Sequence, residues 1–171
     1  MVAHAGNRKN GFLEALLTIP VIYNHKISKD SKYVAYTWKN VHPNLDVFLV
    51  PTDGIKRPVA LTETSEATFV VDFAPDSQSV IVGEDKDRNE RVRLFEVEID
   101  KPRQMTPLTE EDPPYFLRGG ALHPNRKWLV YGANYDSERK KEIEPTWVYR
   151  QDLKSGERTA LAKPAKPTWL Y

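Results

Sequence analysis

The sequence of 171 residues contains no cysteine. This absence excludes disulfide bonds and thiolate zinc sites, and it is typical of proteins of the reducing cytoplasm. The sequence also lacks a large excess of either charge, since 25 lysines and arginines stand against 24 aspartates and glutamates. Such a balance gives no electrostatic reason to bind nucleic acid or an anionic membrane. We therefore expect a cytoplasmic protein with no nucleic-acid partner and no membrane partner.

A long hydrophobic run is absent as well. The most apolar stretch, residues 12–23, contains Glu14 and Pro20 and is too short to span a bilayer. It follows basic residues as a signal peptide would, but its core is not free of charge and no small-residue cleavage site follows. We predict instead a short amphipathic helix at about residues 11–18, which either caps the structure that follows or docks on another domain. Its apolar stripe consists of Phe12, Leu13, Leu16 and Leu17.

What the sequence does contain is a threefold repeat. A small polar turn occurs three times, and its anchor residues stand 46 and 49 positions apart. Repeats of this length that are built from strands are typical of β-propeller blades. The turns are Ser28-Lys29-Asp30-Ser31, Ala74-Pro75-Asp76-Ser77 and His123-Pro124-Asn125-Arg126.

Each turn is followed by strand patterns in matching columns. A nearly continuous apolar run comes first, and such a run is expected for a strand that is covered on both faces. A strand centred on an aromatic residue comes next, and a short strand ending in leucine follows 12 or 13 residues later. The aligned pairs are Val47-Phe48, Leu94-Phe95 and Val148-Tyr149, then Ala60-Leu61, Pro107-Leu108 and Ala160-Leu161.

A further strand precedes each turn, so that each repeat has four strands. It is clearest in residues 69–73, where apolar residues alternate, and its counterparts are residues 21–27 and 115–122. We predict an all-β fold, a partial β-propeller of about three four-stranded antiparallel blades, preceded by the short N-terminal helix. A β-helix or an open stack of three sheets is the structural alternative.

The predicted domain organisation has two parts. Residues 1–20 form an N-terminal segment with the short helix, and residues 21–171 form an incomplete propeller. Propellers close with typically 4 to 8 blades, so three blades leave two faces uncovered. We therefore expect the chain to be part of a larger protein, and to self-associate or be completed by further blades. The expected blades span about 21–63, 67–110 and 114–163, and residues 168–171 begin another strand.

The repeat with its Pro-Asp-Ser turn at 75–77, the charged hairpin at 84–95 and the apolar helix before the first blade resemble a known family. They are similar to the amino-terminal part of prolyl-oligopeptidase-family serine peptidases, most of all to acylaminoacyl peptidase-like members. TolB-like and other propellers share the Pro-Asp turn. The resemblance spans nearly the whole chain. It implies a propeller that covers an α/β-hydrolase domain of the same parent protein and restricts which peptide substrates reach its serine.

The resemblance carries no catalytic residue onto this chain. The sequence has no Gly-x-Ser-x-Gly nucleophile elbow, and most of its serines lie in predicted turns. A triad assembled by folding stays open as an alternative, but the histidines are dispersed. We accordingly assign no catalytic, cofactor-binding or metal-binding residue and expect no cofactor. The histidines are His4, His25, His42 and His123.

One short pattern matches a calcium-binding loop. Asp85, Asp87, Asn89 and Glu96 occupy its positions 1, 3, 5 and 12. The template requires glycine at position 6, where this sequence has Glu90, and it requires flanking helices in place of strands. We interpret the segment as a charged, solvated hairpin of the kind that contacts partners.

Three functions remain compatible with the sequence. The first is the substrate-gating propeller of a cytoplasmic serine peptidase or esterase. The second is a non-enzymatic, TolB-like propeller that binds a protein or peptide. The third is a periplasmic or secreted ligand-binding propeller. A nucleophile elbow in sequence that follows Tyr171 distinguishes the first from the second.

Overall fold

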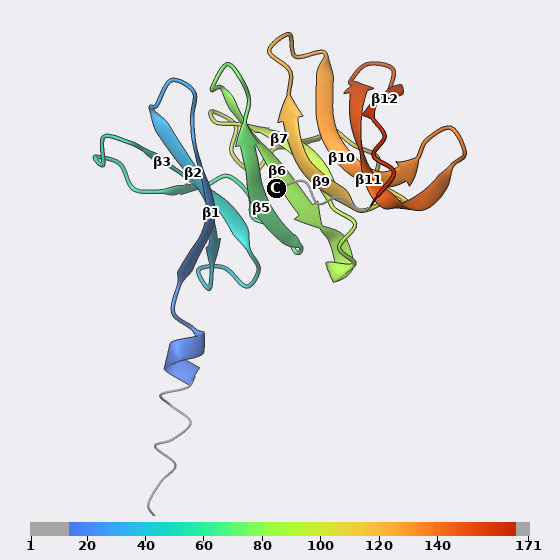
Figure 1. Ribbon diagram of the computed structural model, residues 1–171. Helices are drawn as coiled ribbons and strands as arrows, with labels where there is room; N and C mark the ends of the chain where they lie inside the picture. The colour runs from blue at the N-terminus through green and yellow to red at the C-terminus, as the bar shows by residue number, and fades with distance from the viewer. Residues whose placement is uncertain (1–13, 167–171) are drawn as a thin grey trace, which may run out of the picture.

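The computed structural model describes residues 14–166, which form three four-stranded antiparallel sheets arranged side by side (Figure 1). Each sheet is one consecutive segment and is termed a blade. Blade 1 consists of β1 (Val21–Ile27), β2 (Tyr33–Lys39), β3 (Asp46–Pro51) and β4 (Val59–Ala60). Blade 2 consists of β5 (Ala67–Phe73), β6 (Ser79–Asp85), β7 (Arg93–Glu98) and β8 (Met105–Pro107), with the short 3-10 helix η1 (Lys86–Arg88) after β6. Blade 3 consists of β9 (Leu117–Leu122), β10 (Trp128–Asp136), β11 (Lys141–Asp152) and β12 (Arg158–Ala162).

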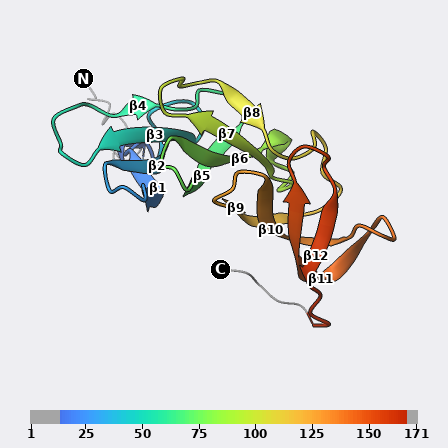
Figure 2. The ribbon, with the colours of Figure 1, turned by 90° about the horizontal axis from the view of Figure 1, so that it is seen from above.

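The blades fan out along an open arc. In each blade the first strand lies at one edge of the sheet and the fourth strand at the other. Seen from above, β1, β5 and β9 follow the inner side of the arc, whereas β4 and β8 lie on its outer side (Figure 2). The central strand of the inner row, β5, contacts both β1 and β9. This is the blade arrangement of a β-propeller, and it confirms the predicted fold class.

The repeated turn has the same hydrogen bonds in every blade. In blade 1 the Ser28 N–H donates to the Tyr33 carbonyl, and the Ser31 N–H donates to the Ser28 carbonyl, both at 2.9 Å. The anchor side chain accepts the N–H two residues later at 3.0 to 3.1 Å, as aspartate and asparagine do in Asx turns. The same local chemistry therefore explains why the pattern recurs. The anchors are Asp30, Asp76 and Asn125.

The aromatic and leucine columns of the sequence are also columns of the structure. In every blade the third strand pairs with the fourth. An aromatic residue of the third strand lies opposite the fourth-strand residue that precedes the leucine. All three aromatic residues are buried. The pairs are Phe48 with Ala60, Phe95 with Pro107 and Tyr149 with Ala160.

Two hydrophobic clusters hold the blades together. Alternate residues of blade 2 face opposite neighbours, because successive strand residues point to opposite sides of a sheet. Val80 and Val82 pack with blade 1, whereas Ile81 and Leu94 pack with blade 3. Each fully buried aliphatic side chain contributes about 1.5 to 3 kcal/mol relative to an exposed one. Contacts between blades therefore account for much of the core.

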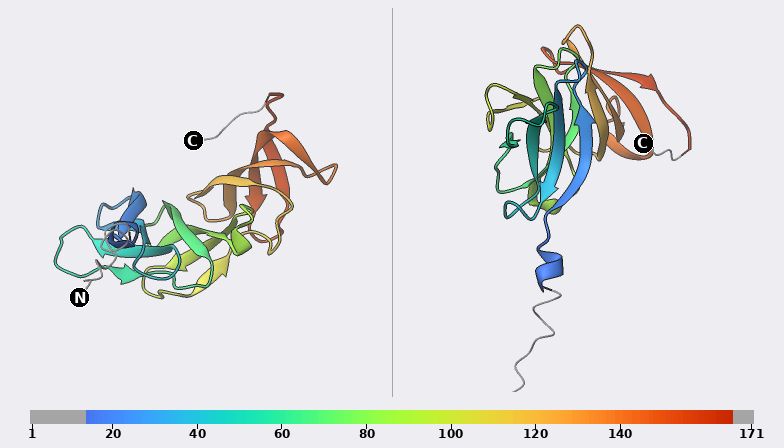
Figure 3. Two further views of the ribbon diagram at one scale, coloured as in Figure 1. Left: turned by 90° about the horizontal axis from the view of Figure 1, so that it is seen from below. Right: turned by 90° about the vertical axis from the view of Figure 1, so that its left-hand side faces the viewer.

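The two outer faces of the arc carry the same columns, but among residues 14–166 no further blade packs against them. On the face of blade 1 that points away from blade 2, Tyr36, Trp38 and Phe48 form an aromatic cluster, and this side of the molecule faces the viewer in Figure 3 (right). On blade 3, Leu161 is 55% exposed. Its equivalents in blades 1 and 2, Leu61 and Leu108, are only 0% and 9% exposed.

A single helical turn precedes blade 1. It covers residues 14–17 of the helix predicted at 11–18, and residues 11–13 lie outside the described part of the chain. Asn40 donates from Nδ2 to the carbonyls of Leu17 and Ile19 at 2.9 and 2.8 Å, which ties the turn to the β2–β3 loop. Within residues 14–166 no helix is long and apolar enough to cross a membrane. The strand expected at 168–171 also lies outside the described residues.

Candidate ligand-binding site on the inner strands

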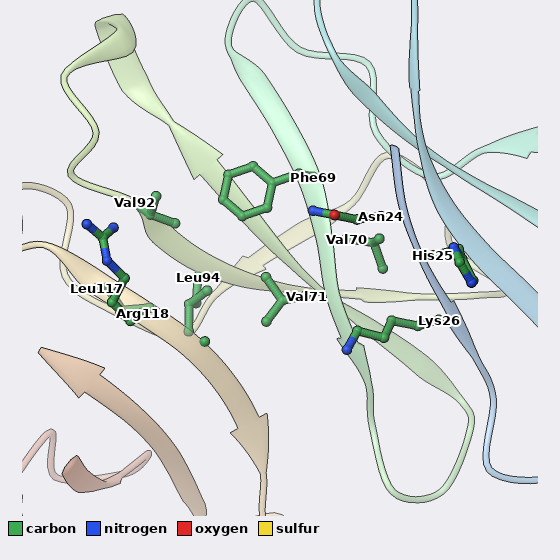
Figure 4. A pocket seen from close by; sticks show the side chains of 11 residues that line it. Asn24, His25, Lys26, Phe69, Val70, Val71, Val92, Leu94, Leu117 and Arg118 are labelled. Atoms are coloured by element: carbon green, nitrogen blue, oxygen red, sulfur yellow. The ribbon is translucent and has the colours of Figure 1, made fainter. Parts of the chain in front are cut away.

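A hollow in the described part of the chain lies on the inner side of the arc. It has a volume of about 660 Å³, which falls within the range of roughly 300 to 1,000 Å³ for small-molecule sites. All three inner strands contribute to it, together with residues 92 and 94 of blade 2 (Figure 4). We refer to this hollow as the inner pocket. It is lined by Asn24, His25, Lys26, Phe69, Val70, Val71, Val92, Leu94, Leu117, Arg118 and Gly119.

Each inner strand carries a β-bulge at the pocket. The register with the second strand shifts by one residue at Asn24 in β1, at Val71 in β5 and at the Gly119-Gly120 pair in β9. In each blade the bulge lies three or four residues before the repeated turn. A bulge re-aims side chains and leaves backbone groups of the extra residue outside the ladder. Three bulges around one hollow therefore give side chains and backbone groups that an extended ligand can contact.

The floor of the pocket is apolar and closely packed from behind. A Cβ atom added at Gly83 would lie 2.6 Å from the Phe69 ring, and one added at Gly120 would lie 2.6 Å from Leu94 Cδ1. Gly120 also has φ +155°, which side chains rarely adopt. Because neither glycine has a side chain, there is room beside them for the side chains of Phe69 and Leu94.

The rim of the pocket is basic. Lys26 comes from β1 and Arg118 from β9, on opposite sides of the apolar floor formed by Val71 and Leu94 (Figure 4). The Arg118 guanidinium lies 5.9 Å from the centre of the Phe116 ring. Among the lining residues there is no aspartate or glutamate. The pocket therefore combines an apolar surface with positive charge.

A polar network beside Tyr115 joins blades 2 and 3 and is structural. Arg158 bonds the carboxylate of Glu110 through Nη2 and donates from Nε to the hydroxyl of Tyr131 at 2.7 Å. The Tyr115 hydroxyl donates to Glu110 Oε2 at 2.9 Å. Burial raises the pKa of both tyrosines above the ordinary value, so they stay protonated donors. Because these groups bond to one another, the network connects blade 2 to blade 3.

No Ser-His-Asp arrangement occurs among residues 14–166. His42 Nδ1 lies 2.8 Å from Asp46 Oδ2. The hydroxyls of Thr62 and Thr68 bond the other carboxylate oxygen of Asp46, at 2.8 and 3.2 Å, and not the imidazole. A nucleophile would have to bond the histidine. This group instead satisfies a buried carboxylate at the boundary between blades 1 and 2.

The remaining histidines are separated from one another. His25 lines the inner pocket, and His123 packs on Trp128 in the repeated turn with ring centres 5.0 Å apart. His4 lies outside the described residues. The structure therefore brings no two of the sequence-identified histidines into one site within the part of the chain that it describes.

The segment that matches the calcium-loop pattern uses its oxygens internally. Asp85 Oδ1 accepts the Glu90 N–H at 2.9 Å, and Asn89 Oδ1 accepts the Arg91 N–H at 2.8 Å. Among the described residues no group of three or more histidines or carboxylates could hold a metal ion. Asp87 and Glu90 have φ of 56° and 63°, values that are uncommon for residues other than glycine. The side-chain oxygens of Asp85 and Asn89 thus stabilise the turns of the hairpin itself.

The inner pocket was not predicted from the sequence. Its bulges follow from the pairing of two strands, which a single strand does not reveal. One signal was present, because the Gly119-Gly120 pair interrupts a predicted strand, and glycine inside a strand often marks a bulge or a close backbone approach. Asn24 and Val71 carry no such signal.

Comparison with solved structures shows the same fold. The chain is similar to a protein described as TolB from Agrobacterium tumefaciens, with a TM-score of 0.68 and 19% identity over 87% of this chain and 49% of the other. It is similar to puromycin hydrolase, with a TM-score of 0.62 and 18% identity over 86% and 22%. It is also similar to oligogalacturonate lyase from Vibrio parahaemolyticus, with a TM-score of 0.60 and 14% identity over 84% and 41%.

These similarities concern the β-propeller fold alone, since all three identities are below 20%. The chain spans about half of the TolB structure and less than half of the other two. No protein-family model and no curated protein matches the sequence.

Proposed function

We propose that this chain is the recognition segment of a β-propeller that binds an extended peptide at the inner pocket and gates its access to a serine-hydrolase domain. The observation that carries the proposal is the set of three bulges, which lies around one partly apolar pocket of about 660 Å³. The segment supplies binding and selection, and the hydrolase domain supplies the chemistry.

Two considerations support the gating role. The sequence resembles the amino-terminal propeller of acylaminoacyl peptidase-like serine peptidases, and the solved structures with a similar fold include puromycin hydrolase. The hydrolase domain, further blades and a cytoplasmic location belong to the same proposal.

A second candidate is a non-enzymatic propeller of TolB type. The observation that favours it is the fold similarity to the Agrobacterium TolB structure, at a TM-score of 0.68. In this case the inner pocket binds a protein segment and no hydrolase domain follows. Both candidates share peptide binding at the pocket and differ in what the rest of the protein does.

Peptide binding is tested by fluorescence anisotropy with labelled apolar peptides of five residues. Val71→Glu places a charge on the pocket floor and should abolish binding, because the floor is where apolar side chains pack. Val59→Glu is the matched control, since Val59 lies on the outer strand β4 and is 52% exposed. Equal binding by both variants would place the ligand elsewhere.

The two candidates are separated with the complete polypeptide that contains this chain. A serine-reactive fluorophosphonate probe should label one serine outside residues 1–171 if the protein is a hydrolase. Peptides too long to pass the propeller should then be cleaved slowly, and Val71→Glu should change the selection by length. Absence of any labelled serine would support the TolB-type alternative.

A further inference from the structure

The packing between the blades identifies a partner for the two faces at the ends of the arc (Figure 2). We term the side of a blade that packs on the preceding blade its front face, and the side that packs on the following blade its back face. We infer that the front face of blade 1 binds the back face of blade 3 of a second copy of this chain. The inference does not depend on which ligand the inner pocket binds.

The back face of blade 3 has the residues of a face that is covered in the other blades. Each back face contains three columns of the repeat, one from the second strand, one from the third and one at the fourth. In blades 1 and 2 every residue of these columns is at most 9% exposed, because the following blade covers it. In blade 3 the same columns are half-buried or exposed. The columns are Ala35, Ile81 and Val130, then Val47, Leu94 and Val148, then Leu61, Leu108 and Leu161.

The front face of blade 1 shows the corresponding difference. Val34 and Val50 are half-buried there, whereas their equivalents in blade 2, Val80 and Val97, are fully buried beside blade 1. Trp38 on the same face is also half-buried. A front face of apolar and aromatic residues is what packs on an aliphatic back face between blades 1 and 2. The two uncovered faces of this chain are therefore of the kinds that pack together within it.

The repeated turns give this contact a register. At the boundary between blades 1 and 2, Ser77 Oγ accepts the N–H of the turn anchor Asp30 at 3.2 Å. The equivalent of Ser77 in blade 1 is Ser31, and the anchor of blade 3 is Asn125. Both of these residues are exposed. Packing of blade 1 on the blade 3 of a second copy therefore places Ser31 of one copy beside Asn125 of the other.

The charged groups at this end of the arc also suit a serine in the turn. Arg126 of blade 3 pairs with two carboxylates of blade 2, those of Asp76 and Glu96. Their equivalents in blade 3 are Asn125 and Arg150, and Arg150 lies over the Trp128 ring in the same blade. An arginine in the next turn would therefore lose both ion pairs, whereas a serine needs neither. Blade 1 supplies that serine.

A contact between two different faces either closes a ring or continues as an open chain of copies. Each copy contributes three blades. Two copies then provide about six blades, which falls within the usual range of 4 to 8 for a closed propeller. We therefore expect a closed pair of copies.

Disulfide trapping tests the register, because the sequence has no cysteine of its own. Ser31→Cys and Asn125→Cys are introduced into separate chains, which are mixed and oxidised with copper phenanthroline. A disulfide forms only where two Cβ atoms lie close together. We expect the mixed, disulfide-linked dimer well above the proportion that random collision gives, with little of either homodimer.

Two further cysteine pairs are the controls. Asp30→Cys together with Ser77→Cys in one chain should form an intramolecular disulfide, since these residues are already in contact at the equivalent boundary. Lys56→Cys replaces Asn125→Cys as the negative control, because Lys56 is exposed in the loop between β3 and β4. Circular dichroism checks that each variant is folded.

Sedimentation equilibrium measures the affinity without any cysteine. Leu161→Lys should raise the dissociation constant about tenfold or more, because it places a charge inside the apolar contact. Ile55→Lys is the matched control and should leave the constant unchanged. Ile55 is 82% exposed, but it lies in the β3–β4 loop and belongs to neither face.

An excess of the mixed dimer, with weaker association of Leu161→Lys alone, supports the inference. The inference is wrong if the chain stays monomeric at high concentration, or if Asn125→Cys is trapped by Ser31→Cys no better than Lys56→Cys. Equal weakening by Leu161→Lys and Ile55→Lys would show non-specific aggregation and would also contradict it. A series of ever larger species in place of a dimer would overturn the closed pair.

Discussion

Arg126 Nη1 lies 2.9 Å from Asp76 Oδ2, and this ion pair joins the repeated turns of blades 2 and 3. Ser77 occupies the same position in the repeat as Arg126, and its hydroxyl accepts the Asp30 N–H at 3.2 Å. One position of the turn thus contacts the preceding turn at both boundaries between blades. The contact is a neutral hydrogen bond at the first boundary and an ion pair at the second.

This relationship predicts a small effect on stability that depends on salt. Arg126→Gln removes the pairs with Asp76 and Glu96 and should lower the free energy of unfolding by about 0.5 to 1 kcal/mol, because the side chain is partly exposed. Urea unfolding at low and high salt measures the difference, which should shrink at high salt. Arg57→Gln, at an exposed loop position, is the control. A loss that is unchanged by salt would show that packing of the arginine, and not its charge, stabilises the turn.

Gly83→Ala should destabilise blade 2 and alter the inner pocket together. The new methyl group would lie 2.6 Å from the Phe69 ring and 3.0 Å from Val92, so both side chains must move. Overpacking of this kind typically costs about 1 to 3 kcal/mol. We expect a lower urea midpoint and weaker peptide binding. Unchanged binding by a variant that is still folded would indicate that Phe69 is not part of the binding surface.

Glu84 makes stability depend on pH. Burial raises the pKa of its carboxyl above the ordinary value of 4.5, while Arg93 opposes the shift from 3.7 Å and Glu66 and Lys86 have smaller, opposite effects. A raised carboxyl pKa means that the folded state holds the proton more strongly than the unfolded state does. The contribution to stability is therefore present below the ordinary pKa and is lost as pH rises through the folded pKa.

This sign gives a measurable comparison for Glu84→Gln, which cannot ionise. Relative to the parent, the variant should gain stability as pH rises from about 4 to 7. Urea unfolding at intervals of pH measures the difference between the two proteins. A difference that stays constant over this range, or falls, would contradict the raised pKa.

The helical turn before blade 1 should contribute little to this chain by itself. Leu16 and Leu17 are 52% and 76% exposed in the described structure. Leu16→Asp should change the free energy of unfolding of residues 1–171 by less than about 0.5 kcal/mol. In the complete polypeptide the same substitution should cost roughly 1.5 to 3 kcal/mol if the helix is buried there against the hydrolase domain. Equal effects in both proteins would show that the helix serves blade 1 alone.

The two outer faces predict self-association of the isolated chain. Leu161 on blade 3 is 55% exposed, and Trp38 on blade 1 is half-buried beside Tyr36, which is itself only 6% exposed. These residues occupy columns that bury side chains between blades elsewhere in the repeat. Exposed apolar faces and strand edges favour association. Light scattering over a dilution series should show dimers or larger species, and Leu161→Lys should reduce them. A compact monomer that persists at high concentration would refute this prediction.

Much of the architecture could be predicted from the sequence, because the contacts that define it are local. The turn hydrogen bonds around Asp30, Asp76 and Asn125 span two to five residues, and the pairing of Phe48 with Ala60 spans twelve. Each such contact depends on residue types at short spacing, so it repeats as a visible pattern. The number of strands and their antiparallel order follow from the same patterns.

The inner pocket could not be predicted, because no local pattern determines where a bulge forms. The extra residue at Val71 arises from the way β5 pairs with β6, and the sequence around it reads as a regular strand. Lys26 and Arg118 are 92 positions apart and meet at one pocket only because β5 lies between β1 and β9. By itself the sequence determined the repeat, the strands and the absence of a nucleophile elbow, since these depend on neighbouring residues. Only the tertiary structure decided the pocket, its charge and the exposed faces, because these depend on how separate blades pack against one another.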